Sequence, residues 1–167
     1  MFTNKFYKKY NEIVDKLKNV DLSSANQTYS DLRSLKTELT FAIGGVKNHE
    51  IYFDILGGAG SIPGEKTRSI KEWGNLDEFK AEVKATGLAA RGWVWLAYDH
   101  DRDFYFVYLG DSQNTYPVWN APPVFALDTY EHGYWMDFGS DRGAYIDAFF
   151  ENLDWNEVEN RVASVTK

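Results

Sequence analysis

The stretch Pro123-Val-Phe-Ala-Leu-Asp-Thr-Tyr-Glu-His-Gly-Tyr134 decides how the rest of this 167-residue sequence is interpreted. Its first five residues form an apolar run, which is typical of a short buried strand. Asp128 and His132 follow, four positions apart. If the strand ends at Leu127 and a helix begins near Tyr130, both side chains converge on one point. Such a pair can bind a metal ion, but it can also simply form a contact on a helix surface.

The composition limits the kinds of site and partner. The chain contains no cysteine, so any metal site must be built from His and carboxylate side chains. A formal charge of −7 argues against a nucleic-acid partner, which favours a basic surface. The first ten residues lack the apolar core of a secretory signal, and no apolar run is long enough to cross a bilayer. We therefore expect a cytoplasmic protein with no membrane partner.

The first third of the chain has the hydrophobic spacing of two helices. Apolar residues recur every three or four positions over residues 2–20 and again from Leu32 to Leu56, where Gly57-Gly58 ends the pattern. A short polar segment joins them, so they are predicted to form an antiparallel hairpin. The Gly, Ser and Pro residues of 57–64 mark a boundary. We predict a helical hairpin over 1–58 and an α+β domain over 59–167.

The second part of the chain alternates short helices with aromatic, β-branched segments that are typical of strands. A β-hairpin and a third strand predict a small three-stranded antiparallel sheet, and the fold class is α+β. The predicted strands are 93–98, 104–108 and 123–127, and the predicted helices are 65–73, 76–86, 130–137, 142–152 and 154–165.

Several motifs in chain order resemble the iron/manganese superoxide dismutase family. They are Asn48-His49, Gly92-Trp-Val-Trp-Leu96, Gln113-Asn114, Leu127-Asp-Thr-Tyr-Glu-His-Gly-Tyr134 with Arg142, and Asn152-Leu-Asp-Trp155. The resemblance implies the family's fold and one bound Mn or Fe ion. In that family the metal is held by a His from each of the first two helices and by the Asp and His of an Asp-x-Trp-Glu-His-x-Tyr motif. The last three ligands correspond here to His49, Asp128 and His132. Without the resemblance, a lone His on an apolar helix stripe is more often a hydrogen-bonded core residue than a ligand.

The resemblance also implies a substrate and a metal preference. Superoxide is the substrate of the family, which converts it to oxygen and hydrogen peroxide. Gln113 resembles the Gln that holds the metal's water in manganese-type members. Gly45 on the second helix stands where iron-type members tend to carry a Gln, so the pair favours the manganese type.

Three further positions correspond to residues around the family's metal cavity, and a fourth corresponds to its dimer interface. Trp93 resembles the cavity-wall Trp. Tyr130 stands where the motif usually has Trp, and Trp135 where a Tyr behind the ligands is usual. Glu131 resembles the acid that reaches across the dimer interface to the partner's metal-binding His. A homodimer is therefore implied.

The first helix departs from the family pattern, because no histidine precedes His49. The family's first ligand corresponds to Lys5, a His behind it to Lys9, and its gateway Tyr to Ile13. The remaining histidine, His100, lies in a polar turn and is predicted to be exposed.

Three interpretations of this departure stay open. The metal can be held by His49, Asp128 and His132 alone, an altered three-ligand set that gives a dismutase or supports other oxygen chemistry. Alternatively, the Lys5 ammonium can replace the metal's charge beside Asp128, which makes the protein a catalytically inactive structural or interaction protein. Lys5 and Lys9 can also simply mark a solvated helix face.

Overall fold

The computed structural model describes residues 2–62, 64, 67–115 and 117–166. The chain divides into two compact units, Met1–Glu50 and Ile51–Lys167, so the division falls inside the second helix. The boundary predicted after residue 58 stays a prediction. None of the described helices is both long and apolar enough to cross a membrane.

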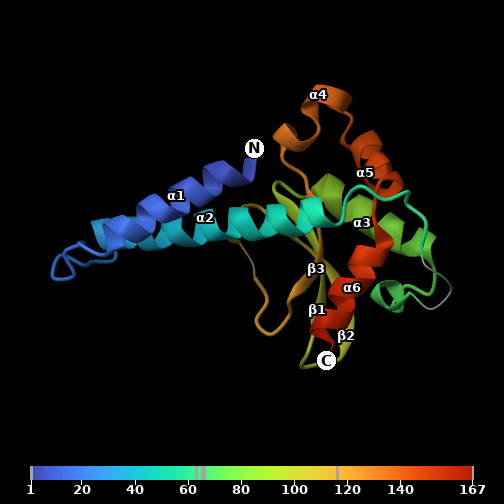
Figure 1. The fold of residues 1–167 in the computed structure, drawn as a ribbon, viewed down its shortest axis with the longest axis horizontal. Helices are drawn as coiled ribbons and strands as arrows, with labels where there is room; N and C mark the ends of the chain where they lie inside the picture. Colours follow the sequence, from blue (N-terminus) through green and yellow to red (C-terminus); the bar gives the residue numbers. More distant parts are fainter. Residues whose placement is uncertain (1, 63, 65–66, 116, 167) are drawn as a thin grey trace. The chain divides into compact units, whose positions relative to one another are not determined.

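The Met1–Glu50 unit holds two helices, α1 (Phe2–Leu17) and most of α2 (Asp31–Asp54). They lie side by side (Figure 1) and are in contact through the rings of Phe6 and Phe41, whose centroids are 6.4 Å apart. The backbone N–H of Arg33 donates to the Ser30 hydroxyl at 3.3 Å, so Ser30 caps the start of α2. The predicted helical hairpin is thus present.

Both helices end earlier than the sequence predicts. At the end of α1, Lys18 and Asn19 donate to carbonyls only three residues back, a tightened turn that closes the helix. At the end of α2, the carbonyl of Ile55 accepts from the N–H of Asp154 at 2.8 Å, and Leu56 forms a β-bridge with Leu153. Tertiary hydrogen bonds therefore replace the last predicted helical residues.

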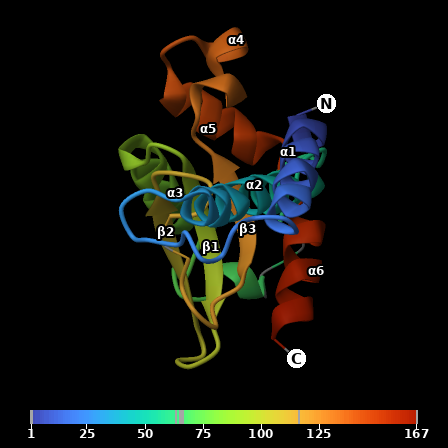
Figure 2. The ribbon, with the colours of Figure 1, turned by 90° about the vertical axis from the view of Figure 1, so that its left-hand side faces the viewer.

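The Ile51–Lys167 unit is built on a three-stranded antiparallel sheet in the order β2-β1-β3. Its α3 helix packs against β1, β2 and α5, and α6 packs against β3. The short α4 lies at the opposite end of this unit from the β1–β2 turn (Figures 1 and 2). The elements are η1 (Arg68–Ile70), α3 (Leu76–Ala89), β1 (Trp93–Asp99), β2 (Phe104–Gly110), β3 (Pro123–Asp128), η2 (Glu131–Gly133), α4 (Trp135–Phe138), α5 (Arg142–Glu151) and α6 (Trp155–Val165).

Two predicted helices are much shorter in the structure. Of the helix predicted over 65–73, the described residues form only the 3-10 turn η1, whose first N–H groups, those of Arg68 and Ser69, donate to the Glu159 carboxylate. Residues 65 and 66 lie outside the described part. The helix predicted over 130–137 is divided into η2 and α4 at Tyr134, whose φ of −141° is not helical.

Candidate metal centre

Asp128 is fixed by its position at the end of β3. The four preceding residues, Val124–Leu127, are fully buried, so the strand is held on both faces. Asp128 lies opposite Trp93 of β1, and the next residue, Thr129, donates its N–H to the carbonyl of Gly92 at 2.8 Å. Asp128 is itself only 2% exposed. A buried carboxylate of this kind needs hydrogen bonds or a cation to offset its desolvation.

Asp128 and His132 come together through a tight turn and not through the predicted helix. One carboxylate oxygen of Asp128, Oδ1, accepts from the N–H of Tyr130 at 2.9 Å, which bends the chain directly after the strand. The 3-10 turn η2 then returns His132, whose Nε2 lies 3.1 Å from Asp128 Oδ2. The two side chains thus present a carboxylate oxygen and an imidazole nitrogen to the same place.

His132 lies at the edge of this pair, with its side chain 36% exposed. The hydrogen bond to Asp128 raises the pKa of His132, and partial burial lowers it by less. The Tyr130 ring stacks on the imidazole, with centroids 5.4 Å apart and planes 14° apart. A proton or a metal ion can therefore occupy the space between the imidazole and the carboxylate.

Gln113 and Trp93 form a second buried polar contact in the same unit. The indole Nε1–H of Trp93 donates to Gln113 Oε1 at 3.0 Å, and Gln113 is 5% exposed. Because the amide oxygen is used in this bond, the NH2 group of Gln113 is turned away from Trp93 and is oriented to donate. Both residues were predicted from the sequence to belong to the site.

His49 belongs to α2 and is buried, with 1% of its surface exposed. Its Nδ1 lies 2.6 Å from the carbonyl oxygen of Gly45, one helical turn earlier. A carbonyl can only accept, so Nδ1 carries a proton, and in the neutral imidazole the lone pair is then on Nε2. That tautomer is the one in which Nε2 can bind a metal.

Phe6 of α1 is the neighbour of His49 within the Met1–Glu50 unit. Its ring centroid lies 5.2 Å from that of His49. A Cβ atom added at Gly45 would lie 2.5 Å from the Phe6 ring, so the glycine makes this close approach possible. Phe6 was not predicted as a site residue, although it belongs to the apolar stripe that Ile13 continues.

The other predicted positions differ in exposure. Ile13 is buried, at 3%, whereas Lys5 and Lys9 are exposed. Lys9 forms an ion pair with Glu12 at 3.4 Å in which both side chains are largely exposed. Lys5 and Lys9 therefore have the exposure that is usual for solvated surface lysines. Trp135 of α4 is 52% exposed, and Glu131 of η2 is exposed, as is His100.

Two buried tyrosines behind Asp128 were also missed. The Tyr145 hydroxyl, on α5, donates to the main-chain carbonyl of Asp128 at 2.8 Å. The hydroxyl of Tyr52 lies 3.2 Å from that of Tyr145. Burial raises the pKa of both tyrosines. On apolar helix stripes such residues look like ordinary core positions, so the sequence carried no signal for this role.

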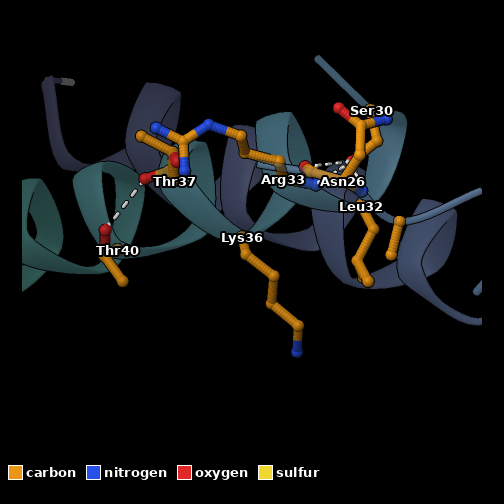
Figure 3. A pocket seen from close by; sticks show the side chains of 8 residues that line it. Asn26, Ser30, Leu32, Arg33, Lys36, Thr37 and Thr40 are labelled. Carbon is orange, nitrogen blue, oxygen red and sulfur yellow. Dashed lines mark hydrogen bonds between the residues drawn. The ribbon is translucent and has the colours of Figure 1, made fainter. Parts of the chain in front are cut away.

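A groove of about 500 Å³ near the start of α2 does not form a comparable site. It contains the cations Arg33 and Lys36 and the hydroxyl of Thr37. Figure 3 shows Lys36 pointing away from the Arg33 guanidinium, which lies beside Thr37. The charges do not converge on one ligand position.

Comparison with known proteins identifies the family to which the chain belongs. Residues 65–161 match the C-terminal domain of the iron/manganese superoxide dismutases. Over 167 aligned residues the chain is 40% identical to a protein named superoxide dismutase [Fe] from Aquifex aeolicus, and the alignment covers 95% of this chain and 78% of that protein. This chain belongs to the iron/manganese superoxide dismutase family. The corresponding protein of Aquifex pyrophilus is 41% identical, with the same coverage.

Manganese-named members of the iron/manganese superoxide dismutase family are also similar to the chain. Superoxide dismutase [Mn] 1 of Halobacterium salinarum is 37% identical over 94 residues, which is 56% of this chain and 47% of that protein. The predicted fold, with its helical hairpin and three-stranded antiparallel sheet, is the family's fold and is confirmed. The preference for manganese that Gly45 and Gln113 suggest stays a prediction, because similar proteins are named for either metal.

Proposed function

We propose that this protein binds one Mn or Fe ion through His49, Asp128 and His132 and dismutes superoxide to oxygen and hydrogen peroxide. The observation that carries the proposal is the buried Asp128 carboxylate with the His132 Nε2 3.1 Å from it, in a chain of the superoxide dismutase family. In the reaction, one superoxide loses an electron to give oxygen. A second superoxide gains one and takes up two protons to give hydrogen peroxide.

The donor set fits such a metal ion. Each of the three residues offers one ligand atom, an imidazole nitrogen or a carboxylate oxygen. Two imidazoles and one carboxylate suit iron(II) or manganese and leave further coordination positions open. The Nδ1–H of His49 faces the carbonyl of Gly45, which leaves Nε2 as the donor atom. A cation beside Asp128 would also offset the cost of burying its charge.

The course of α2 supports the choice of His49 as the third ligand. The helix is continuous to Asp54, and Tyr52 follows His49 by about one turn. Tyr52 belongs to the same compact unit as Asp128, and its hydroxyl meets the Tyr145 hydroxyl that binds the Asp128 carbonyl. The part of α2 that follows His49 and belongs to the Ile51–Lys167 unit is thus joined by hydrogen bonds to the strand that carries Asp128.

The chain's own groups would orient the reactants and handle protons. A bound Mn or Fe supplies the reversible one-electron change that dismutation requires. Gln113, fixed by Trp93, directs its NH2 group to hold a water or the reduced oxygen species by a hydrogen bond. The absence of a helix-one His removes one ligand, so we expect weaker metal binding and slower turnover than in a four-ligand relative.

Metal content and superoxide consumption test this proposal. After expression with both metals supplied, we expect roughly one equivalent of Mn plus Fe per chain and measurable loss of superoxide. Asp128→Asn keeps the shape of the side chain but removes its charge, and it should abolish both. Less than about a tenth of an equivalent in the unaltered protein would contradict the proposal. A loaded but inactive protein would instead indicate other chemistry at the same centre.

We further propose that the protein is a homodimer in which Glu131 reaches the partner subunit. Glu131 begins the short turn η2 and is exposed, one residue before His132. Light scattering should give twice the mass of one chain, and Glu131→Ala should shift the protein toward the monomer. A monomer at micromolar concentration in the unaltered protein would contradict this assembly.

A further inference from the structure

Asp128 is held from behind by a hydrogen bond to its main chain. The Tyr145 hydroxyl donates to the Asp128 carbonyl at 2.8 Å, while the Asp128 side chain accepts from Tyr130 and faces His132. Tyr145 comes from α5, far from β3 in the sequence. A separate element therefore fixes the backbone at the point where the strand turns toward His132.

The hydroxyls of Tyr52 and Tyr145 form a chain of hydrogen bonds that ends at the Asp128 carbonyl, and this last acceptor determines the direction of donation. A carbonyl oxygen can only accept, so Tyr145 uses its single proton on Asp128. At the 3.2 Å contact between the two hydroxyls, Tyr52 must therefore donate and Tyr145 must accept. The chain runs from Tyr52 through Tyr145 to Asp128. Tyr52 is 8% exposed and Tyr145 5%, so water does not readily replace either bond.

Aromatic packing fixes both phenol rings. Tyr52 stacks on Phe149 with centroids 5.8 Å apart, and its ring meets the Trp93 indole edge-on at 6.3 Å. Tyr145 stacks on Tyr134 at 5.3 Å. The hydroxyls therefore have little freedom to move with a loosened Asp128. They form a rigid support and not an adaptable one.

We propose that Tyr145, oriented by Tyr52, is a positioning residue that holds Asp128 in the geometry required of a metal ligand. This inference rests on the proposed function, because it assigns these two hydroxyls to the same metal site. Groups behind metal ligands orient them, and removing such a group typically weakens metal binding by about 10- to 100-fold.

The test compares Tyr145→Phe with Tyr134→Phe. The two tyrosines are equally buried, at 5% exposed, and stack on each other, and each variant removes one hydrogen-bonded hydroxyl. The Tyr134 hydroxyl accepts a hydrogen bond from the Arg142 guanidinium. Dissociation constants for Mn²⁺ are measured by competition with a chelator. We expect Tyr145→Phe to weaken binding at least about tenfold and Tyr134→Phe to change it less than about threefold.

A second measurement in the metal-free protein separates this inference from the proposed function. Hydrogen exchange at the Tyr130 N–H, which donates to Asp128, reports whether the carboxylate is held in place. We expect faster exchange in Tyr145→Phe than in Tyr134→Phe. That result in a protein which binds no metal would end the proposed function but keep the positioning role of Tyr145.

Equal metal affinities and equal Tyr130 exchange in the two variants would overturn the inference. Tyr52→Phe provides the same test if Tyr145→Phe fails to fold. It keeps the bond from Tyr145 to Asp128 but removes the donor that orients Tyr145, so a smaller effect in the same direction is expected. An effect of Tyr52→Phe no larger than that of Tyr134→Phe would then count against the inference.

Discussion

At the scale of single residues, Asp128 and His132 form a close pair, and groups from other elements hold the proposed ligands in place. The pair could be predicted from the sequence because it follows an apolar run at a spacing of four, and the tight turn after β3 brings the two side chains together. The supports of the proposed ligands could not be predicted: Tyr145 contacts Asp128 of β3 from α5, and Phe6 contacts His49 of α2 from α1. Such contacts depend on tertiary packing, which leaves no local pattern in the sequence.

The role of Lys5 distinguishes two interpretations: a protein that binds a metal ion, and an inactive protein in which the Lys5 ammonium replaces the metal's charge. Lys5 is exposed, which disfavours the interpretation in which its ammonium is buried to replace the metal's charge. We predict that Lys5→His strengthens Mn²⁺ binding by about tenfold or more, because it restores an imidazole at the position that corresponds to the missing ligand, and tenfold is about 1.4 kcal/mol of binding. Isothermal titration measures this change.

Lys5→Gln is the matched control, since it removes the same charge without adding a ligand. It should leave the free energy of unfolding nearly unchanged. A loss of about 3 to 5 kcal/mol would instead show that Lys5 pairs with a buried acid, and the inactive alternative would gain support. If Lys5→His binds Mn²⁺ no better than Lys5→Gln does, the correspondence of Lys5 with the family's first ligand is wrong.

At the scale of elements, the three strands, α5 and α6 were predicted to within two residues, whereas α1 ends three residues earlier and α3 three residues later than predicted. The predicted strand at 93–98 differs from β1 by one residue, because aromatic and β-branched side chains mark the whole strand. The ends of α2 and the short η1 are set by partners far along the chain, such as Asp154 for Ile55 and Glu159 for Ser69. Local spacing predicts that a helix exists, but distant hydrogen bonds decide where it stops.

The contact between α1 and α2 gives an element-scale prediction at Gly45. Replacing a helical glycine with alanine usually stabilises a protein by up to about 1 kcal/mol. Here the new Cβ would lie 2.5 Å from the Phe6 ring, and overpacking of this kind costs about 1 to 3 kcal/mol. We therefore expect Gly45→Ala to lower the free energy of unfolding of the metal-free protein, as measured by urea denaturation.

Gly143→Ala in α5 serves as its control. The nearest atom to a Cβ at Gly143 is a carboxylate oxygen of Asp141 at 3.4 Å, an ordinary contact. Gly143→Ala should be neutral or slightly stabilising. Equal stabilisation by both substitutions would show that Phe6 moves aside at no cost and that the glycine is not needed for helix packing.

At the scale of the whole molecule, the proposed centre draws its ligands from distant parts of the chain. His49 comes from α2, whereas Asp128 and His132 flank a turn after β3. Motifs spread from Asn48 to Trp155 indicated the family from the sequence alone, and the fold agrees with that family. Family membership does not predict how the absence of a His in the first helix changes the site, because that depends on how the three proposed ligands and the groups behind them would hold an ion.

X-ray absorption spectroscopy of the Mn-loaded protein tests the three-ligand centre most directly, because the imidazole signal counts the histidines bound to the metal. We predict two imidazoles in the unaltered protein, and one in each of His49→Ala and His132→Ala. His100→Ala, which changes the exposed histidine, should leave two. An unchanged imidazole count in His49→Ala or in His132→Ala would contradict the account.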